Sequence, residues 1–151
     1  MNKISKKDLK QRVIVGSREF GISTVLYRHK VGAKLGVNVT DMECLGVLFF
    51  KGVSTPSELS RYTGLSSGAT TTMLDRLEKS SLIERRPNPK DRRGTLISVK
   101  DEAKQYVGPM FAQVREAQDA LMGTYSEEEL HLLADFFQKI TAIWEEQRQK
   151  L

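Results

Sequence analysis

Residues 55–80 read TPSELSRYTGLSSGATTTMLDRLEKS and contain two helix starts separated by a tight turn. At the first start, Thr55 supplies a capping hydroxyl, Pro56 occupies the first helical position, and Glu58 stands where its carboxylate can reach back to the cap. This short helix is predicted to end at about Tyr62, because a Thr-Gly pair follows it.

The second helix start lies at Ser66, which is expected to cap a helix from Ser67 to about Ser80. A short capped helix, a tight turn containing glycine and a second amphipathic helix are the sequence signature of a helix-turn-helix. The buried side of the second helix is predicted to consist of Ala69, Met73, Leu74 and Leu77.

A β-hairpin is predicted directly after the helix-turn-helix. Residues 82–86 (LIERR) and 95–99 (TLISV) each have the composition of a short strand, and Pro87–Gly94 between them has turn composition. The tip of this turn carries Lys90, Asp91, Arg92 and Arg93. A hairpin behind a helix-turn-helix is the arrangement of a winged helix, with the hairpin as the wing.

Helices are predicted on both sides of the winged helix. Ser5 and Asp8 form a capping box that opens a helix over residues 6–30, which Gly32 and Gly36 end. Thr40 is expected to cap a helix over residues 41–51 that Gly52 ends. The apolar face of this second helix is predicted to comprise Leu45, Leu48 and Phe49.

Two long helices are predicted in the last third of the chain. One extends from Asp101 to about Met122, with a bend at Gly108-Pro109, and the other opens at a capping box that begins with Ser126. The predicted fold class is therefore mainly α with a small β-hairpin wing. We expect one domain over residues 1–151, with a winged-helix lobe at 40–100 and a helical dimerisation lobe formed by 1–35 and 101–151.

Dimerisation is expected because the winged-helix lobe is large enough to have its own core. The terminal helices must then bury their apolar stripes elsewhere, and a twofold-related copy of the chain provides that surface. Two reading heads about one DNA turn apart predict a pseudopalindromic site on duplex DNA.

The charge distribution favours a polyanionic partner. Residues 54–100 hold nine Lys/Arg against five Asp/Glu, whereas residues 101–151 hold five against ten. A concentrated basic region is typical of nucleic-acid binding, and a plain solvated surface of the same charge is the alternative.

Other functional classes find little support in the composition. No apolar run approaches the length of a membrane span, no leader segment is recognisable, and we expect a cytoplasmic protein without a membrane partner. One cysteine, Cys44, and two distant histidines, His29 and His131, give no basis for a metal centre. No nucleophile or phosphate-loop motif indicates an enzyme, and no cofactor is expected.

The second helix of the helix-turn-helix fits the major groove of B-DNA. Its first turns offer hydroxyls and a glycine that allow close approach, and its N-terminus favours a phosphate. An arginine on a hairpin tip can enter the minor groove, and Asp91 can hold its guanidinium in place. The alternatives are that Ser66 only caps its helix and that the tip is a solvated turn. The helix residues concerned are Ser66, Ser67, Gly68, Thr70 and Thr71.

The stretch LSRYTGLSSGATTTMLDRLEKSSLIERRPNPKDRRGTLISV, residues 59–99, resembles the core of MarR-family transcriptional regulators. The resemblance implies a DNA-binding homodimer in which Arg93 is the wing arginine, Asp91 orients it, and Arg76 is a basic position of the recognition helix. Ser81 departs from the family pattern, which has glycine there; if the position needs a positive φ, serine costs on the order of 1 kcal/mol.

The resemblance also implies regulation by a signal. Many members bind small aromatic effectors in a crevice between the two lobes, although nothing in this sequence singles out an anchoring residue. Some members sense oxidants through a cysteine, but Cys44 lies among apolar residues and is expected to be a core residue. We expect a repressor that a small molecule releases from DNA; a winged helix used for non-specific DNA binding or for protein contact is the alternative.

Overall fold

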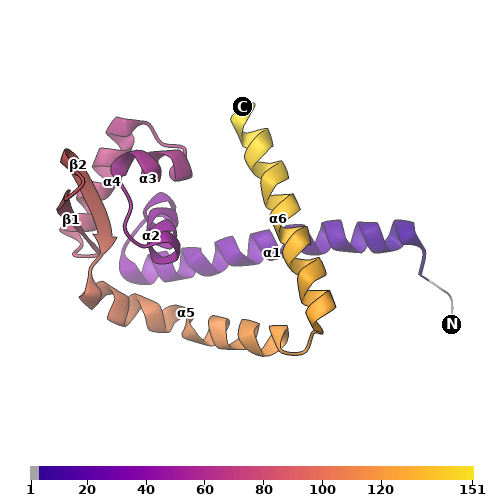
Figure 1. The fold of residues 1–151 in the computed structure, drawn as a ribbon. Helices are drawn as coiled ribbons and strands as arrows, with labels where there is room; N and C mark the ends of the chain where they lie inside the picture. The colour runs from indigo at the N-terminus through magenta and orange to yellow at the C-terminus, as the bar shows by residue number, and fades with distance from the viewer. Residues whose placement is uncertain (1–3) are drawn as a thin grey trace. The chain divides into compact units, whose positions relative to one another are not determined.

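The computed structural model describes residues 4–151, apart from the side chains of Arg92 and Arg93. It divides into two compact units, Met1–Val107 and Gly108–Leu151. The predicted class, helical with one antiparallel hairpin, is confirmed (Figure 1). The elements are α1 (Lys6–Leu35), α2 (Val39–Lys51), α3 (Pro56–Thr63), α4 (Ser67–Lys79), β1 (Ile83–Asn88), β2 (Asp91–Val99), α5 (Asp101–Met122) and α6 (Glu127–Gln149).

Capping side chains set most helix starts, as predicted. The Ser5 hydroxyl accepts a hydrogen bond from the Asp8 backbone N–H, and the Ser66 hydroxyl accepts one from Ala69. Thr55 and Ser126 each form a complete capping box with the glutamate three residues later. These side chains satisfy N–H groups that the helix itself leaves without acceptors.

Two predictions about the junction of α1 and α2 are wrong. Helix α1 continues through Gly32 to Leu35 and ends at Gly36, which has a φ of 66°. Gly32 instead allows close packing, since a Cβ there would lie 3.2 Å from the Val37 carbonyl oxygen. Helix α2 is capped by Asn38 rather than Thr40, because the Asn38 side chain accepts the Asp41 N–H at 2.8 Å.

The core of the winged-helix lobe lies among α2, α3, α4 and the hairpin. On α4 the predicted Met73, Leu74 and Leu77 are buried, but Ala69 is exposed and Thr70 takes its place in the core. On α2, Leu45 and Leu48 are buried as predicted, whereas Phe49 is 39% exposed. Leu59, Leu82, Ile83, Ile97 and Val99 complete this core from the neighbouring elements.

The wing is longer than its sequence suggests. Strands β1 and β2 pair antiparallel from Ile83↔Val99 to Pro87↔Thr95, and a register shift follows Pro87. The predicted turn over Pro87–Gly94 narrows to two residues, because strand pairing continues to Asn88 and begins again at Asp91. Proline is tolerated at the end of β1 because a strand of a two-stranded sheet has an unpaired edge. A bridge from Ser54 to Ile97 joins the α2–α3 connection to β2.

The second unit contains the end of α5 and all of α6, and residues 123–126 connect the two helices. Pro109 lies inside α5, one residue past the boundary between the two units. Among the described residues of α6 none is buried. Within residues 4–151, no helix combines the length and the hydrophobicity that crossing a bilayer requires.

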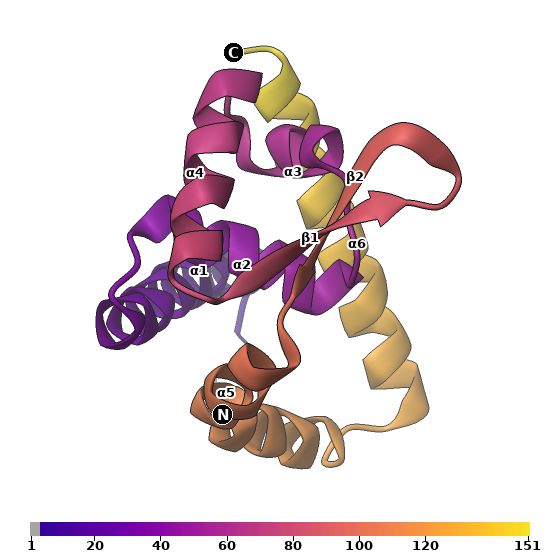
Figure 2. The ribbon, with the colours of Figure 1, turned by 90° about the vertical axis from the view of Figure 1, so that its left-hand side faces the viewer.

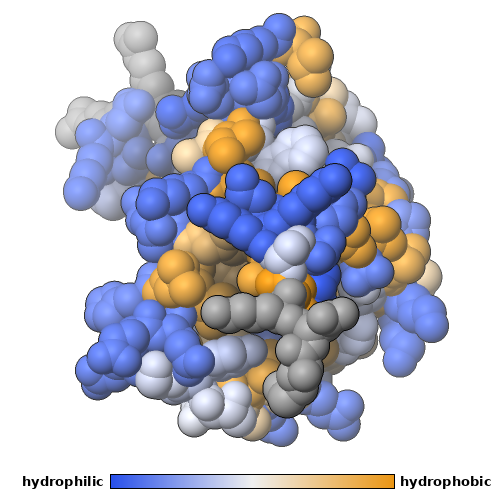
Figure 3. Space-filling view, turned by 90° about the vertical axis from the view of Figure 1, so that its right-hand side faces the viewer, coloured by the Kyte–Doolittle hydropathy of each residue, from blue (hydrophilic) through white to orange (hydrophobic). Residues whose placement is uncertain are grey.

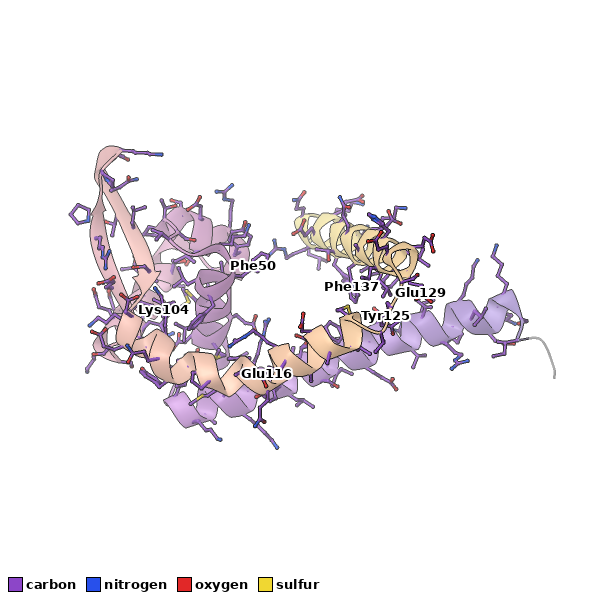
Figure 4. The ribbon with its side chains drawn as sticks, turned by 60° about the horizontal axis from the view of Figure 1, so that its bottom comes forward. Phe50, Lys104, Glu116, Tyr125, Glu129 and Phe137 are labelled. Atoms are coloured by element: carbon purple, nitrogen blue, oxygen red, sulfur yellow. The ribbon has the colours of Figure 1, made fainter. Side chains whose placement is uncertain are left out.

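Large apolar side chains remain at the surface of the single chain. Figure 3, which views the molecule from the right-hand side of Figure 1, shows hydrophobic residues among hydrophilic ones. In α1 they include Leu9, Val13, Ile14, Phe20 and Leu26, each about half exposed or more. On α6 they include Leu132, Phe137 and Trp144, of which Phe137 is labelled in Figure 4.

Candidate nucleic-acid interface

The first two turns of α4 present small polar residues to solvent. Ser67, Gly68, Thr71 and Thr72 are exposed, and a Cβ at Gly68 would meet no atom within 4 Å. The hydroxyls of Thr71 and Thr72 donate to the carbonyls one turn earlier, at 3.0 and 3.1 Å. Because the hydroxyl proton is already donated within the helix, each exposed threonine offers a methyl group and hydroxyl lone pairs, which suit thymine methyls and base amino groups. Sequence reasoning missed Thr72, although its spacing from Gly68 places it on the same face.

Two of the predicted contact residues on α4 have structural roles. The prediction that Thr70 contacts DNA is wrong. Thr70 is 1% exposed and its hydroxyl donates to the Ser66 carbonyl at 2.9 Å, so its side chain cannot reach DNA. The Ser66 hydroxyl accepts the Ala69 N–H at 3.3 Å and so caps the helix. Ser66 is nevertheless exposed, at the positive end of the helix dipole.

Arg76 is engaged with another helix. Its guanidinium donates from Nη2 to Asp41 Oδ1 at 2.7 Å and from Nε to Asp41 Oδ2 at 3.2 Å. The hydrogen bond to Asp41 raises the pKa of Arg76 above its ordinary value. Asp41 lies in the first turn of α2 and is buried, so the pair joins α2 to α4.

A second arginine ties the wing to α4. Arg85 of β1 donates to Asp75 Oδ1 at 2.7 Å and to Glu78 Oε2 at 2.5 Å. The Asp75 side chain is 60% exposed, so an acid stands on the outer side of α4 beside its neutralising arginine. This link joins residues of two elements, and nothing in the local sequence pattern pointed to it.

The tip of the hairpin stands clear of the helices of its lobe (Figure 2). Its turn consists of Pro89 and Lys90, and the Lys90 N–H donates to Asn88 Oδ1 at 3.0 Å. Gly94 packs tightly there, since a Cβ would lie 3.1 Å from Asp91 Oδ2 and 3.2 Å from Asn88. Lys90 and Asp91 are exposed as expected.

The two arginines of the tip, Arg92 and Arg93, lie in β2 with side chains outside the described part of the structure. The expected pairing of Arg93 with Asp91 therefore stays a prediction.

Cys44 lies in α2 and is fully buried. Burial raises the pKa of its thiol to about 12, and the nearby charge of Asp41 acts in the same direction. A thiol with such a pKa stays protonated at neutral pH and is a poor nucleophile. In the described part of the chain, His, Cys, Asp and Glu side chains form no group that could hold a metal ion.

The sequence matches the model of the MarR family over residues 37–95, which cover α2, α3, α4 and most of the wing. It is 33% identical over 147 residues to the uncharacterized HTH-type transcriptional regulator YcgE of Bacillus subtilis, a match that covers 97% of this chain and 96% of YcgE.

Solved structures have the same fold. The structure of apo MarR from E. coli aligns with a TM-score of 0.56 at 22% identity, over 93% of this chain and 98% of that one. NadR in complex with 4-hydroxyphenylacetate aligns with a TM-score of 0.62 at 19% identity, over 93% and 97% of the two chains. With a full-length relative above 30% identity and a family match centred on the helix-turn-helix and wing, the chain belongs to the MarR family of DNA-binding transcriptional regulators.

Proposed function

We propose that this regulator binds duplex DNA as a homodimer, with α4 in the major groove and the hairpin tip in the adjacent minor groove. The observation that carries the proposal is the exposed face of α4, where glycine, serine and threonine residues lie on a lobe that has its own core. The proposed contacts on α4 are Ser66, Ser67, Gly68, Thr71 and Thr72. Those on the wing are Lys90, Arg92 and Arg93, with Asp91 orienting an arginine.

The proposed dimer is supported by α1. Val13, Ile14 and Leu26 point in different directions around the helix, yet each is about half exposed or more. A helix that is apolar on several sides is normally enclosed by other helices. A second copy of the chain would provide that cover and would place two α4 helices on one pseudopalindromic site.

We further propose that the protein acts in the cytoplasm as a repressor released by a small aromatic molecule, without catalytic activity. The support is the likeness to NadR, whose solved complex contains 4-hydroxyphenylacetate. A depression along α1 supplies apolar, phenolic and cationic groups of the kind that an aromatic acid would need. Its lining is Ser23, Leu26, Tyr27, His29, Lys30 and Ala33. Such a ligand can release DNA only if it binds the non-binding dimer more tightly.

The wing contact is tested with Arg93→Ala. Loss of a groove contact should weaken DNA binding by about 10- to 100-fold, the usual worth of one arginine contact. Titration of a labelled duplex, followed by gel shift, measures the effect. Arg148→Ala, in the last turn of α6, is the matched control and should leave affinity unchanged. Unchanged affinity of Arg93→Ala would remove the wing from the interface.

Binding to many unrelated sequences with equal affinity would instead favour the architectural alternative. A regulator should prefer its site by about 10³-fold or more. Complete insensitivity to salt would favour a protein adaptor, because phosphate contacts make affinity fall steeply with salt.

A further inference from the structure

Asp41 is a buried carboxylate at an unusual place. Its residue is 3% exposed, it occupies the first turn of α2, and its two oxygens each accept one hydrogen bond from Arg76 of α4. Removing a carboxylate from water is costly unless its oxygens are hydrogen-bonded. Arg76 supplies both bonds from a position 35 residues later in the chain.

The geometry argues against Arg76 as a DNA contact. Asp41 takes Nε and one N–H of Nη2, which fixes the guanidinium plane toward the carboxylate. Turning that plane toward a phosphate would leave the carboxylate buried without its charge partner. Breaking one side of such a pair is strongly unfavourable. The Arg76 side chain is 47% exposed, whereas the Asp41 side chain is 4% exposed. The arginine therefore lies on the solvent side of the pair and covers the carboxylate.

The pair also has a directional effect that the core does not provide. Met73, Leu74 and Leu77 hold α4 through apolar contacts, which tolerate small rotations and slides. A two-bond arginine–carboxylate pair has a fixed plane and fixed distances. It therefore defines how α4 is rotated about its own axis, and with it the direction in which Thr71 and Thr72 face.

The acid end of this pair is itself fixed. The Asp41 N–H donates to the Asn38 side chain at 2.8 Å, and the next residue, Met42, packs where Gly32 lets α1 approach α2. The first turn of α2 is thus held against α1 on one side and against α4 on the other.

We infer that Arg76 and Asp41 are positioning residues for DNA binding: their pair sets the orientation of α4, and Arg76 makes no phosphate contact of its own. The inference rests on the proposed function, since it assigns the residues that orient the proposed reading helix.

The test compares Arg76→Ala, Arg76→Lys, Asp41→Asn and the double variant Arg76→Ala/Asp41→Asn. The probe is a fluorescein-labelled duplex obtained by selection from random DNA with the wild-type protein, titrated at several salt concentrations. Each single variant should weaken binding by about tenfold, and the double variant should be no weaker than the worse single variant, because both remove one interaction. The slope of log Kd against log salt concentration should stay that of the wild type.

Arg76→Lys separates the two roles of the arginine. It keeps the positive charge but lacks the planar fork, so it should bind DNA several-fold more weakly than the wild type. The inference is overturned if Arg76→Lys binds like the wild type, or if Arg76→Ala lowers the salt slope by about 0.9, the value of one phosphate contact, while Asp41→Asn leaves Kd unchanged.

Urea unfolding of the same variants without DNA separates this inference from the proposed function. If Asp41→Asn and Arg76→Ala have non-additive effects on the free energy of unfolding, the two side chains interact in the folded lobe whether or not DNA is bound. Absence of DNA binding by the wild type would overturn the proposed function and the DNA-binding role of the pair together. Additive effects on the free energy of unfolding would overturn the inference that Arg76 and Asp41 act as a pair and would leave the proposed function untouched.

Discussion

Ser81 ends α4 in a conformation that disfavours its own side chain. Its φ is 57°, its N–H donates to the Glu78 carbonyl at 2.9 Å, and the N–H of Leu82 donates to the Leu77 carbonyl at 3.0 Å. These two bonds form the Schellman pattern, in which glycine is the usual residue at the left-handed position. Ser81 thus has the positive φ that glycine would adopt at this position in the family pattern.

We predict that Ser81→Gly raises the free energy of unfolding by about 1 kcal/mol, because glycine adopts this φ without a Cβ penalty. Urea denaturation measures the change. Ser80→Gly is the matched control: Ser80 has a φ of −79°, so glycine there should be neutral or destabilising. A Ser81→Gly protein no more stable than the wild type would show that this turn carries no strain.

Cys44 makes stability depend on pH in the alkaline range. Its pKa is raised from 9.0 to about 12 by burial first and by the Asp41 charge second. The folded chain therefore keeps the proton while the unfolded chain loses it. The stabilisation is fully present below pH 9 and falls as the pH rises towards 12, by at most about 1.4 kcal/mol per pH unit.

The variant Cys44→Ala should lack this component. We predict that the stability difference between the wild type and Cys44→Ala shifts in favour of the variant between pH 9 and pH 10.5, as measured by urea unfolding at each pH. All other titrating groups are shared by the two proteins and cancel in the comparison. A difference that does not change with pH would mean that water reaches the thiol.

At the scale of elements, Arg85 determines how β1 sits on α4. Without it, Asp75 and Glu78 would leave two uncompensated negative charges beside the face of α4 that is proposed to contact DNA. We predict that Arg85→Ala weakens DNA binding by roughly tenfold or more. Arg86→Ala should have a smaller effect, since Arg86 pairs with Glu84 of its own strand. Equal effects of the two variants in duplex titrations would show that general positive charge, not the tie to α4, matters.

The sequence predicts elements well where the signal is local. The starts of α3, α4 and α6 depend on caps within three residues, and these positions are correct. The start of α2 is ambiguous in the sequence because Asn38 and Thr40 are both good caps. In the structure the Asn38 side chain accepts the Asp41 N–H and so caps the helix. The exchange of Ala69 for Thr70 in the core arises because a threonine can bury its hydroxyl by donating to the preceding turn.

The ion pairs of the candidate site could not be derived from one sequence. Asp41 and Arg76 lie 35 residues apart, and only the packing of α2 against α4 brings them together. The resemblance identified Arg76 as a residue of interest but assigned it to DNA. Its hydrogen bonds to Asp41 are the basis for the positioning role inferred above.

At the scale of the whole molecule, the surface of α1 predicts self-association. Val13 is 51% exposed and Leu26 is 60% exposed in the single chain. A carboxylate placed in a buried dimer interface would be desolvated without a partner. We predict that Val13→Glu or Leu26→Glu shifts the mass measured by light scattering from twice the chain mass of 17.1 kDa towards one chain. Gln11→Glu, on the same helix at an exposed polar position, should stay dimeric. A wild-type protein that is monomeric at micromolar concentration would contradict the dimer.

The most direct test of the central claim is selection of bound duplexes from a random DNA pool with the wild-type protein at near-physiological salt, followed by sequencing. A dimer that reads two successive major grooves should enrich an inverted repeat with half-site centres about 10 bp apart. A pool that binds but stays random, or a pool from which nothing is retained, would contradict the claim that this protein reads DNA sequence through paired α4 helices.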